Sequence, residues 1–96
     1  MIFMLLDEKE YFKLAAYVKA SRYRLKIIDF LSDGKYGMPL EIADKVNIKQ
    51  SHISKILKDL KEKDLVECIN PEVRKGKLYH LTVTGEETVP YIRRIS

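Results

Sequence analysis

Apolar side chains recur with helical spacing over most of this 96-residue chain. Spacing at i, i+3, i+4 and i+7 places apolar residues on one face of a helix. In residues 7–20 this face consists of Tyr11, Leu14, Ala15 and Val18. The same period predicts further helices over residues 22–32, 39–46, 50–63 and 86–95. The pattern therefore predicts a domain built mainly from helices.

The residues between these runs are of types that begin or end helices. Ser21 is a good N-terminal cap for the second helix, although the first two runs also fit one bent helix. Asp33 and Gly34 stop the second run, and Pro39 suits the first turn of the third. Asn47 tolerates a left-handed backbone, so we expect it to form the turn between the third and fourth helices.

The period changes after the fourth helix. Residues 65–69 and 78–83 are short and rich in β-forming side chains, and turn residues separate them: Asn70, Pro71 and Gly76. This predicts a β-hairpin, and a short extended piece at residues 36–38 makes a sheet of two or three strands. The predicted fold class is α+β, mainly α. We expect one domain over residues 1–96, with an N-terminal helix in 1–20, a core in 21–83 and a C-terminal helix in 84–96.

Positive charge is concentrated in two of these segments. The chain has a net charge of +4, which alone is a weak indication of an anionic partner. Residues 49–63 carry five lysines against two acidic residues, and residues 70–80 carry three cations against one glutamate. The first twenty residues have no net charge. The fold must decide whether the two basic segments meet.

The predicted helix over residues 50–63 has two different faces. Its apolar stripe consists of Ile53, Ile56, Leu57 and Leu60. The opposite face carries Ser51, Ser54, Lys55, Lys58 and Glu62. An ordinary amphipathic helix with a solvated lysine face has the same pattern. A helix that enters the major groove of DNA also needs both faces, because the apolar one holds it and the polar one contacts bases.

Taken in order, the motifs resemble the winged helix-turn-helix regulators of prokaryotes, including the MarR-like and ArsR-like proteins. The resemblance covers residues 21–90. Residues 38–43 resemble the start of the positioning helix, and residues 48–60 resemble the recognition helix. Residues 61–66 resemble the segment that leads into the first wing strand, and residues 70–82 resemble the wing. Residues 84–87 resemble the start of the last helix.

The resemblance implies a transcriptional regulator, expected to be a repressor, that binds double-stranded DNA sequence-specifically. It places the recognition helix in the major groove and the basic wing on the minor groove or backbone beside it. The helix residues expected to contact DNA are Lys49, Gln50, Ser51, His52, Ser54, Lys55 and Lys58. The wing residues, which suit phosphate or the minor groove, are Arg74, Lys75 and Lys77. A solvated turn would have the same composition as this wing.

The chain departs from the family pattern at three positions. Asn47 and Asp64 stand where the family usually has glycine, and both tolerate the left-handed backbone that a helix end needs. Lys49 stands where a serine or aspartate cap is common, so the cap of the recognition helix is not identified.

We expect neither an enzyme nor a cofactor or metal site. Cys68 is the only cysteine, and with His52 and His80 it lacks the spacing of zinc ligands. Nothing resembles a nucleophile elbow or a glycine-rich phosphate loop. The apolar run over residues 1–6 is far shorter than the roughly 20 residues that span a bilayer. It also lacks the basic region of a signal peptide, so we expect a cytoplasmic protein without a membrane partner.

Apolar side chains near both ends predict a homodimer formed through the terminal helices. The run over residues 1–6 and the stripe of residues 7–20 precede the part that resembles the family, and Val89, Ile92 and Ile95 follow it. A small domain has difficulty burying all of them, and large exposed apolar patches mark interfaces. Alternatively, the terminal helices fold back on their own core.

Two other functions fit the same sequence. One is a winged helix used for protein contacts within a transcription or replication assembly, which would expose apolar surface and respond weakly to salt. The other is RNA binding, which normally uses aromatic side chains on strands. The tyrosines of this chain are instead expected at the edges of the core.

Overall fold

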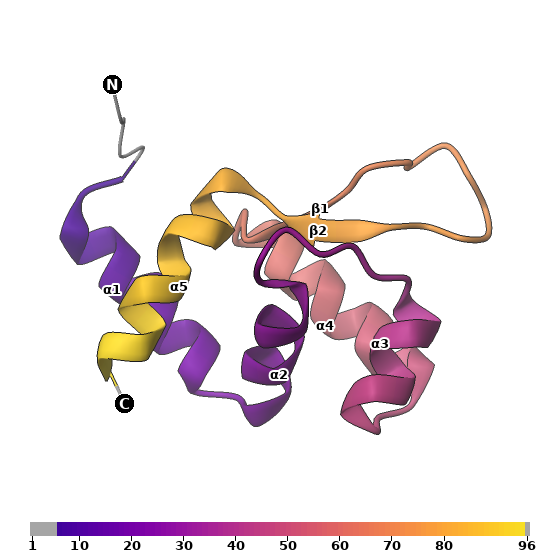
Figure 1. Cartoon of the computed structure of the whole chain (residues 1–96), viewed down its shortest axis with the longest axis horizontal. Helices are drawn as coiled ribbons and strands as arrows, with labels where there is room; N and C mark the ends of the chain where they lie inside the picture. The colour runs from indigo at the N-terminus through magenta and orange to yellow at the C-terminus, as the bar shows by residue number, and fades with distance from the viewer. Residues whose placement is uncertain (1–5, 96) are drawn as a thin grey trace.

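The computed structural model describes residues 6–95, which form five helices and one two-stranded antiparallel sheet (Figure 1). The fold is mainly helical, as predicted, and the first two runs are separate helices. In chain order the elements are α1 (Glu8–Lys19), α2 (Arg22–Leu31), α3 (Pro39–Val46), α4 (Gln50–Glu62), β1 (Val66–Cys68), β2 (Tyr79–Leu81) and α5 (Val83–Ile95).

Several expected polar residues lie at helix boundaries. Ser21 Oγ accepts a hydrogen bond from the Arg24 N–H at 3.3 Å and so caps α2. The α3–α4 turn contains Asn47 in the left-handed conformation, with φ 60°. Asp64 has φ 61° where α4 leads into β1, as its place in the family pattern predicted. Lys49 makes no side-chain cap at the start of α4.

The hydrophobic core includes residues of all five helices and both strands, and its part between α2, α3 and α4 orients α4. The apolar stripe of α4 is buried against the other two helices, with Ile53 and Leu60 fully inaccessible to solvent. The same core cluster includes Ile27, Leu31 and Ile42 of α2 and α3. Since burying one such side chain contributes about 1.5–3 kcal/mol, this packing fixes which face of α4 points to solvent.

The terminal helices α1 and α5 pack against each other at one end of the domain (Figure 1). The Tyr11 and Tyr91 rings stack with centroids 5.2 Å apart, and Phe12 meets Tyr91 edge-on at 4.8 Å. The Tyr11 hydroxyl donates a 2.6 Å hydrogen bond to the carboxylate of Glu87. These contacts fix α1 and α5 to each other within one molecule.

This packing changes the argument for an interface between two copies. Ala15, Val18 and Ile92, which the sequence suggested for a partner, are buried within the chain. The side chains left partly exposed on the terminal helices are fewer, and they include Leu14, Val89 and Ile95. Residues 1–5, also expected at the interface, lie outside the described residues. Burial alone therefore no longer requires a dimer.

The hairpin strands are shorter than predicted. Val66 lies opposite Leu81 and Cys68 opposite Tyr79, and the Ile69 N–H still donates to the Leu78 carbonyl at 2.9 Å. Beyond that bond the chain forms a long loop. Gly37 pairs with Tyr79 through two 2.9 Å backbone hydrogen bonds, so the extended piece adds an isolated bridge to the other edge of β2.

The last helix begins at Val83, three residues before the predicted start, so the prediction of a strand through Val83 is wrong. The reason is a cap: Thr82 Oγ1 accepts from the Gly85 N–H at 2.9 Å, and the Thr82 carbonyl accepts from the Glu86 N–H at 2.9 Å. Pro90 consequently lies inside α5 and not near its start. Pro90 and Glu86 are both exposed, so water can reach the backbone carbonyl that proline leaves without a partner.

Candidate nucleic-acid interface

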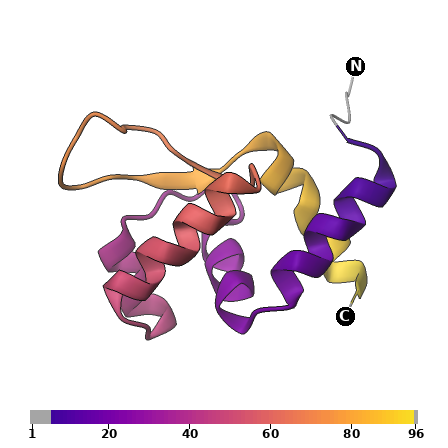
Figure 2. The same cartoon turned by 180° about the vertical axis from the view of Figure 1, so that it is seen from behind.

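The polar face of α4 is open to solvent. Figure 2 shows the side of the molecule on which α4 lies in front, with the hairpin above it. The exposed side chains on this helix include Ser51, Lys55 and Lys58, and none of these three forms a hydrogen bond or ion pair with residues 6–95. They are therefore free to contact a ligand.

The hairpin loop is held in shape by Asn70. Its side-chain oxygen accepts from the Leu78 N–H at 2.8 Å, while its amide nitrogen donates to the Gly76 carbonyl at 3.0 Å. Gly76 has φ 76°, a conformation that other residues rarely adopt. One side chain thus joins both sides of the loop that carries the three basic residues.

The two basic segments meet across a cleft of about 580 Å³. One wall is the start of α4, represented by Gln50 and Ser54. The facing wall is the hairpin loop, with Arg74, Lys75 and Lys77. The start of α4 therefore faces the hairpin loop, which the sequence left undecided; the α4 wall of the cleft is polar and uncharged, and the positive charge that lines it comes from the loop.

A third wall of this cleft was not predicted. It is the N-terminus of α3, where Met38, Pro39 and Leu40 line the cleft and Leu40 is 62% exposed. The Glu41 carboxylate accepts a 2.9 Å hydrogen bond from the Met38 N–H and so fixes this turn. The sequence predicted that α3 begins at Pro39, but it did not predict that this helix start lies next to the hairpin loop.

His52 lies away from this cleft. Its ring meets the Tyr23 ring of α2 nearly edge-on, with centroids 5.4 Å apart. Because successive helix residues differ by about 100°, His52 and Ser54 point to different flanks of α4. Lys49 is exposed in the turn before the helix. The ten predicted contact residues thus do not form a single cluster.

Tyr79 borders the cleft as a neutral phenol. Burial raises the pKa of Tyr79 above its ordinary value, and the nearby Cys68 raises this pKa further. The ring therefore adds no negative charge next to the three hairpin cations at neutral pH. Its backbone pairs with both β1 and Gly37, so Tyr79 also joins the hairpin to the rest of the domain.

The histidines and the cysteine do not gather. His80 Nε2 lies 2.8 Å from the Glu67 carboxylate, and the Cys68 thiol donates to Asn70 Oδ1 at 3.5 Å. Within residues 6–95 no three potential metal ligands come together. None of the helices in this range is long and apolar enough to cross a membrane.

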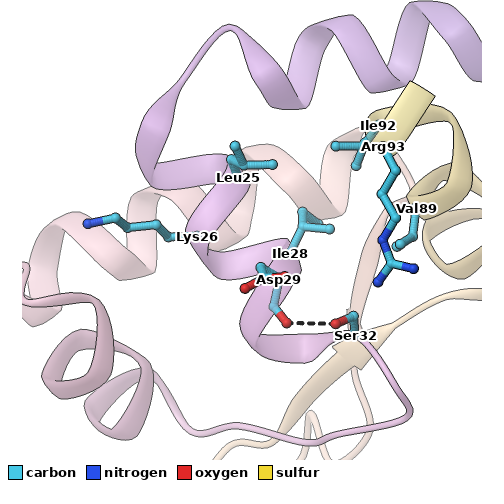
Figure 3. Close-up of a pocket in the computed structure, with 8 residues that line it drawn as sticks. All are labelled: Leu25, Lys26, Ile28, Asp29, Ser32, Val89, Ile92 and Arg93. Atoms are coloured by element: carbon cyan, nitrogen blue, oxygen red, sulfur yellow. Dashed lines mark hydrogen bonds between the residues drawn. The ribbon is translucent and has the colours of Figure 1, made fainter. Parts of the chain in front are cut away.

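A separate hollow of about 320 Å³ lies between α2 and α5, away from the cleft (Figure 3). Its apolar walls are Leu25, Ile28, Val89 and Ile92, with Lys26, Asp29 and Arg93 also lining it. At one end of the hollow, Ser32 Oγ donates a 2.7 Å hydrogen bond to the backbone carbonyl of Asp29. One of the partly exposed apolar side chains of the terminal helices, Val89, is thus part of the wall of this hollow.

Together, the helix-turn-helix of α3 and α4 and the basic hairpin that follows define a winged helix protein. The model of the winged helix DNA-binding domain family matches residues 33–85. The chain belongs to this family of winged helix DNA-binding domains. The hairpin is its wing, and α4 corresponds to the recognition helix. No curated protein matches the sequence.

Solved structures share the fold at low sequence identity. HlyU from Vibrio cholerae in its reduced form is 23% identical, with a TM-score of 0.67 over 94% of this chain and 97% of its own. MarR from E. coli is 19% identical, with a TM-score of 0.69 over 98% and 77%. RV1404 from Mycobacterium tuberculosis is 17% identical, with a TM-score of 0.70 over 90% of this chain; the match spans only 61% of RV1404.

Proposed function

We propose that this protein recognises a specific double-stranded DNA sequence, with α4 in the major groove and the wing on the minor groove or the adjacent backbone. The observation that carries the proposal is the cleft in which the polar face of α4 meets the three cations of the wing. The major groove is wide enough to admit a helix. The wing then lies where a phosphate backbone borders that groove.

The two parts of this surface have different roles in the proposal. Ser51 and Lys55 lie near the centre of the exposed face of α4 and contact base edges, with Gln50, Ser54 and Lys58 beside them. Lys75, Arg74 and Lys77 contact phosphates and hold the helix in register. Lys49 and His52, at the edges of α4, contact the backbone.

The proposed effect on transcription is repression. A protein that occupies a promoter excludes polymerase by overlap, and this requires only DNA binding. The proposed active form is a homodimer joined through the terminal helices, acting in the cytoplasm. The partly exposed Leu14, Val89 and Ile95 support this interface, together with the apolar hollow beside α5.

The described surface favours DNA over the other two candidate functions. The exposed large apolar side chains other than Ile95 belong to separate segments and do not continue along one element: Tyr36, Leu40, Ile69 and Val83. They give a partner protein no single apolar face. The rings within β1 and β2 are those of Tyr79 and His80, and both are half-buried, whereas RNA binding on strands uses several exposed rings.

The division of roles is tested on a sequence selected from a random duplex library. Ser51→Ala and Lys55→Ala are expected to reduce discrimination between this sequence and random duplex by about 1–3 kcal/mol each, the contribution of a good base contact. Lys75→Ala is expected to weaken binding to both duplexes equally. A wing variant that changes sequence preference, together with helix variants that do not, would reverse the assignment.

A further inference from the structure

A cation of α2 and the lysine that directly follows α4 both lie near one aromatic ring of α1. The Arg24 guanidinium lies 3.9 Å from the centroid of the Tyr17 ring, and the Lys63 ammonium lies 5.1 Å from it. Arg24 Nη1 also donates a 2.6 Å hydrogen bond to the Tyr17 carbonyl oxygen. The arginine is therefore fixed, and the lysine approaches the same ring.

These two charges have no acidic partner. Among residues 6–95 no carboxylate lies within 4.0 Å of Arg24 or Lys63, and the ion pairs formed there involve other residues, Lys13 with Glu10 and His80 with Glu67. Asp59 is on the same flank of α4 but pairs with neither. The Tyr17 ring attracts both cations without neutralising them. Two cations that contact one ring and have no acidic partner leave positive charge available to an anion.

The cluster lies on the side of α4 opposite the wing. His52 and Lys63 are eleven residues apart, which at about 100° per residue returns to nearly the same direction. Both contact rings of the preceding helices, Tyr23 and Tyr17. Ser54, which lines the wing cleft, points about 180° away from Lys63 by the same geometry. In Figure 2, α4 accordingly lies between the wing and the C-terminal half of α1.

We propose that Arg24 and Lys63, held by Tyr17, bind a phosphate of the DNA backbone on the side of the recognition helix opposite the wing. The inference rests on the proposed function. A major groove is bordered by two phosphate backbones, so a helix inside it has one on each flank. The wing contacts one of these two backbones, and the Arg24–Lys63 cluster contacts the other. Such contacts position the protein and carry no sequence information.

The test compares two variants that lose the same charge. Arg24→Gln with Lys63→Gln removes the cluster, whereas Lys9→Gln with Lys13→Gln removes two exposed cations of α1 outside it. Binding of each to a labelled random-sequence duplex is measured over a series of salt concentrations. The logarithmic salt slope should become shallower by about 0.9 for each phosphate that the cluster binds, and should stay at the wild-type value for the α1 control.

Folding is checked separately, because Arg24 also holds the end of α1. Lys63→Gln alone changes only an exposed side chain, and it should already make the slope shallower than that of the α1 control. Wild-type binding with identical slopes for the cluster and control variants would overturn this inference and leave the proposed function standing. Absence of wild-type binding to duplex would instead overturn the proposed function, and this inference with it.

Discussion

At the scale of single residues, the shape of the wing depends on one short amide side chain. Asn70 bonds to Leu78 and Gly76, which lie eight and six residues further along the chain. The strands themselves are only three residues long each. The loop that carries Arg74, Lys75 and Lys77 therefore has little sheet structure to fix it, and Asn70 supplies the connection.

Asn70→Ala is expected to release the wing loop without unfolding the domain. The Leu78 N–H and the Gly76 carbonyl lose their partners, which should cost about 1 kcal/mol of stability. Amide hydrogen exchange at Leu78 should become faster, and affinity for random duplex should fall. In the matched variant Asn70→Asp, the acceptor for Leu78 remains, so exchange there should stay slow. Unchanged exchange in Asn70→Ala would show that other contacts hold the loop.

At the scale of elements, the contact between α5 and the start of the hairpin decides where the last helix lies. Gly85 is in the first turn of α5, and a Cβ at this position would collide with the Leu65 carbonyl oxygen. Thr82 binds the same region, because its hydroxyl donates to the Asp64 carbonyl at 2.6 Å. The glycine thus allows the helix and the hairpin to approach closely.

Gly85→Ala should destabilise the protein, although alanine normally favours a helix over glycine by about 1 kcal/mol. The collision with Leu65 should outweigh that gain and cost about 1–3 kcal/mol, as overpacked sites do. Val83→Ala, at an exposed position of the same helix, is the control and should be nearly neutral. Denaturant unfolding measures both. A Gly85→Ala protein as stable as wild type would mean that the helix shifts easily.

The sequence predicts elements well where the apolar period is local, and less well where a distant contact sets a boundary. The stripe of α4 predicted its exposed face, and Asn47 predicted the turn before it. The start of α5 was missed because its cap, Thr82, was assigned to a strand and because the Gly85–Leu65 contact is tertiary. The Met38–Leu40 wall of the cleft, and the Tyr17 cluster, each need elements whose packing no local pattern describes.

At the scale of the whole molecule, the proposed homodimer depends on the apolar surface that the terminal helices leave exposed. The packing of α1 on α5 buries much of the apolar surface that suggested a dimer, and what is left is smaller. A twofold dimer would still allow two recognition helices to contact half-sites about 34–36 Å apart. In this proposal, the partly exposed residues of the terminal helices form the surface through which the two copies associate.

We predict a dimer mass in sedimentation at micromolar concentration. Leu14→Glu and Ile95→Glu should each shift the protein toward monomer, because a charge at an apolar interface is desolvated without a partner. Ile69→Glu, at an exposed apolar position outside the terminal helices, should leave the mass unchanged. A wild-type monomer, with Leu14→Glu and Ile95→Glu both retaining full DNA affinity, would exclude the dimer.

We propose that α4 and the wing together bind double-stranded DNA through its phosphates. The most direct measurement is a titration of the wild-type protein against a random-sequence duplex at two salt concentrations. We predict binding at low salt that weakens steeply at high salt, with a logarithmic slope of about −0.9 for each phosphate contact. Absence of binding at low salt, or an affinity that salt leaves unchanged, would contradict the account.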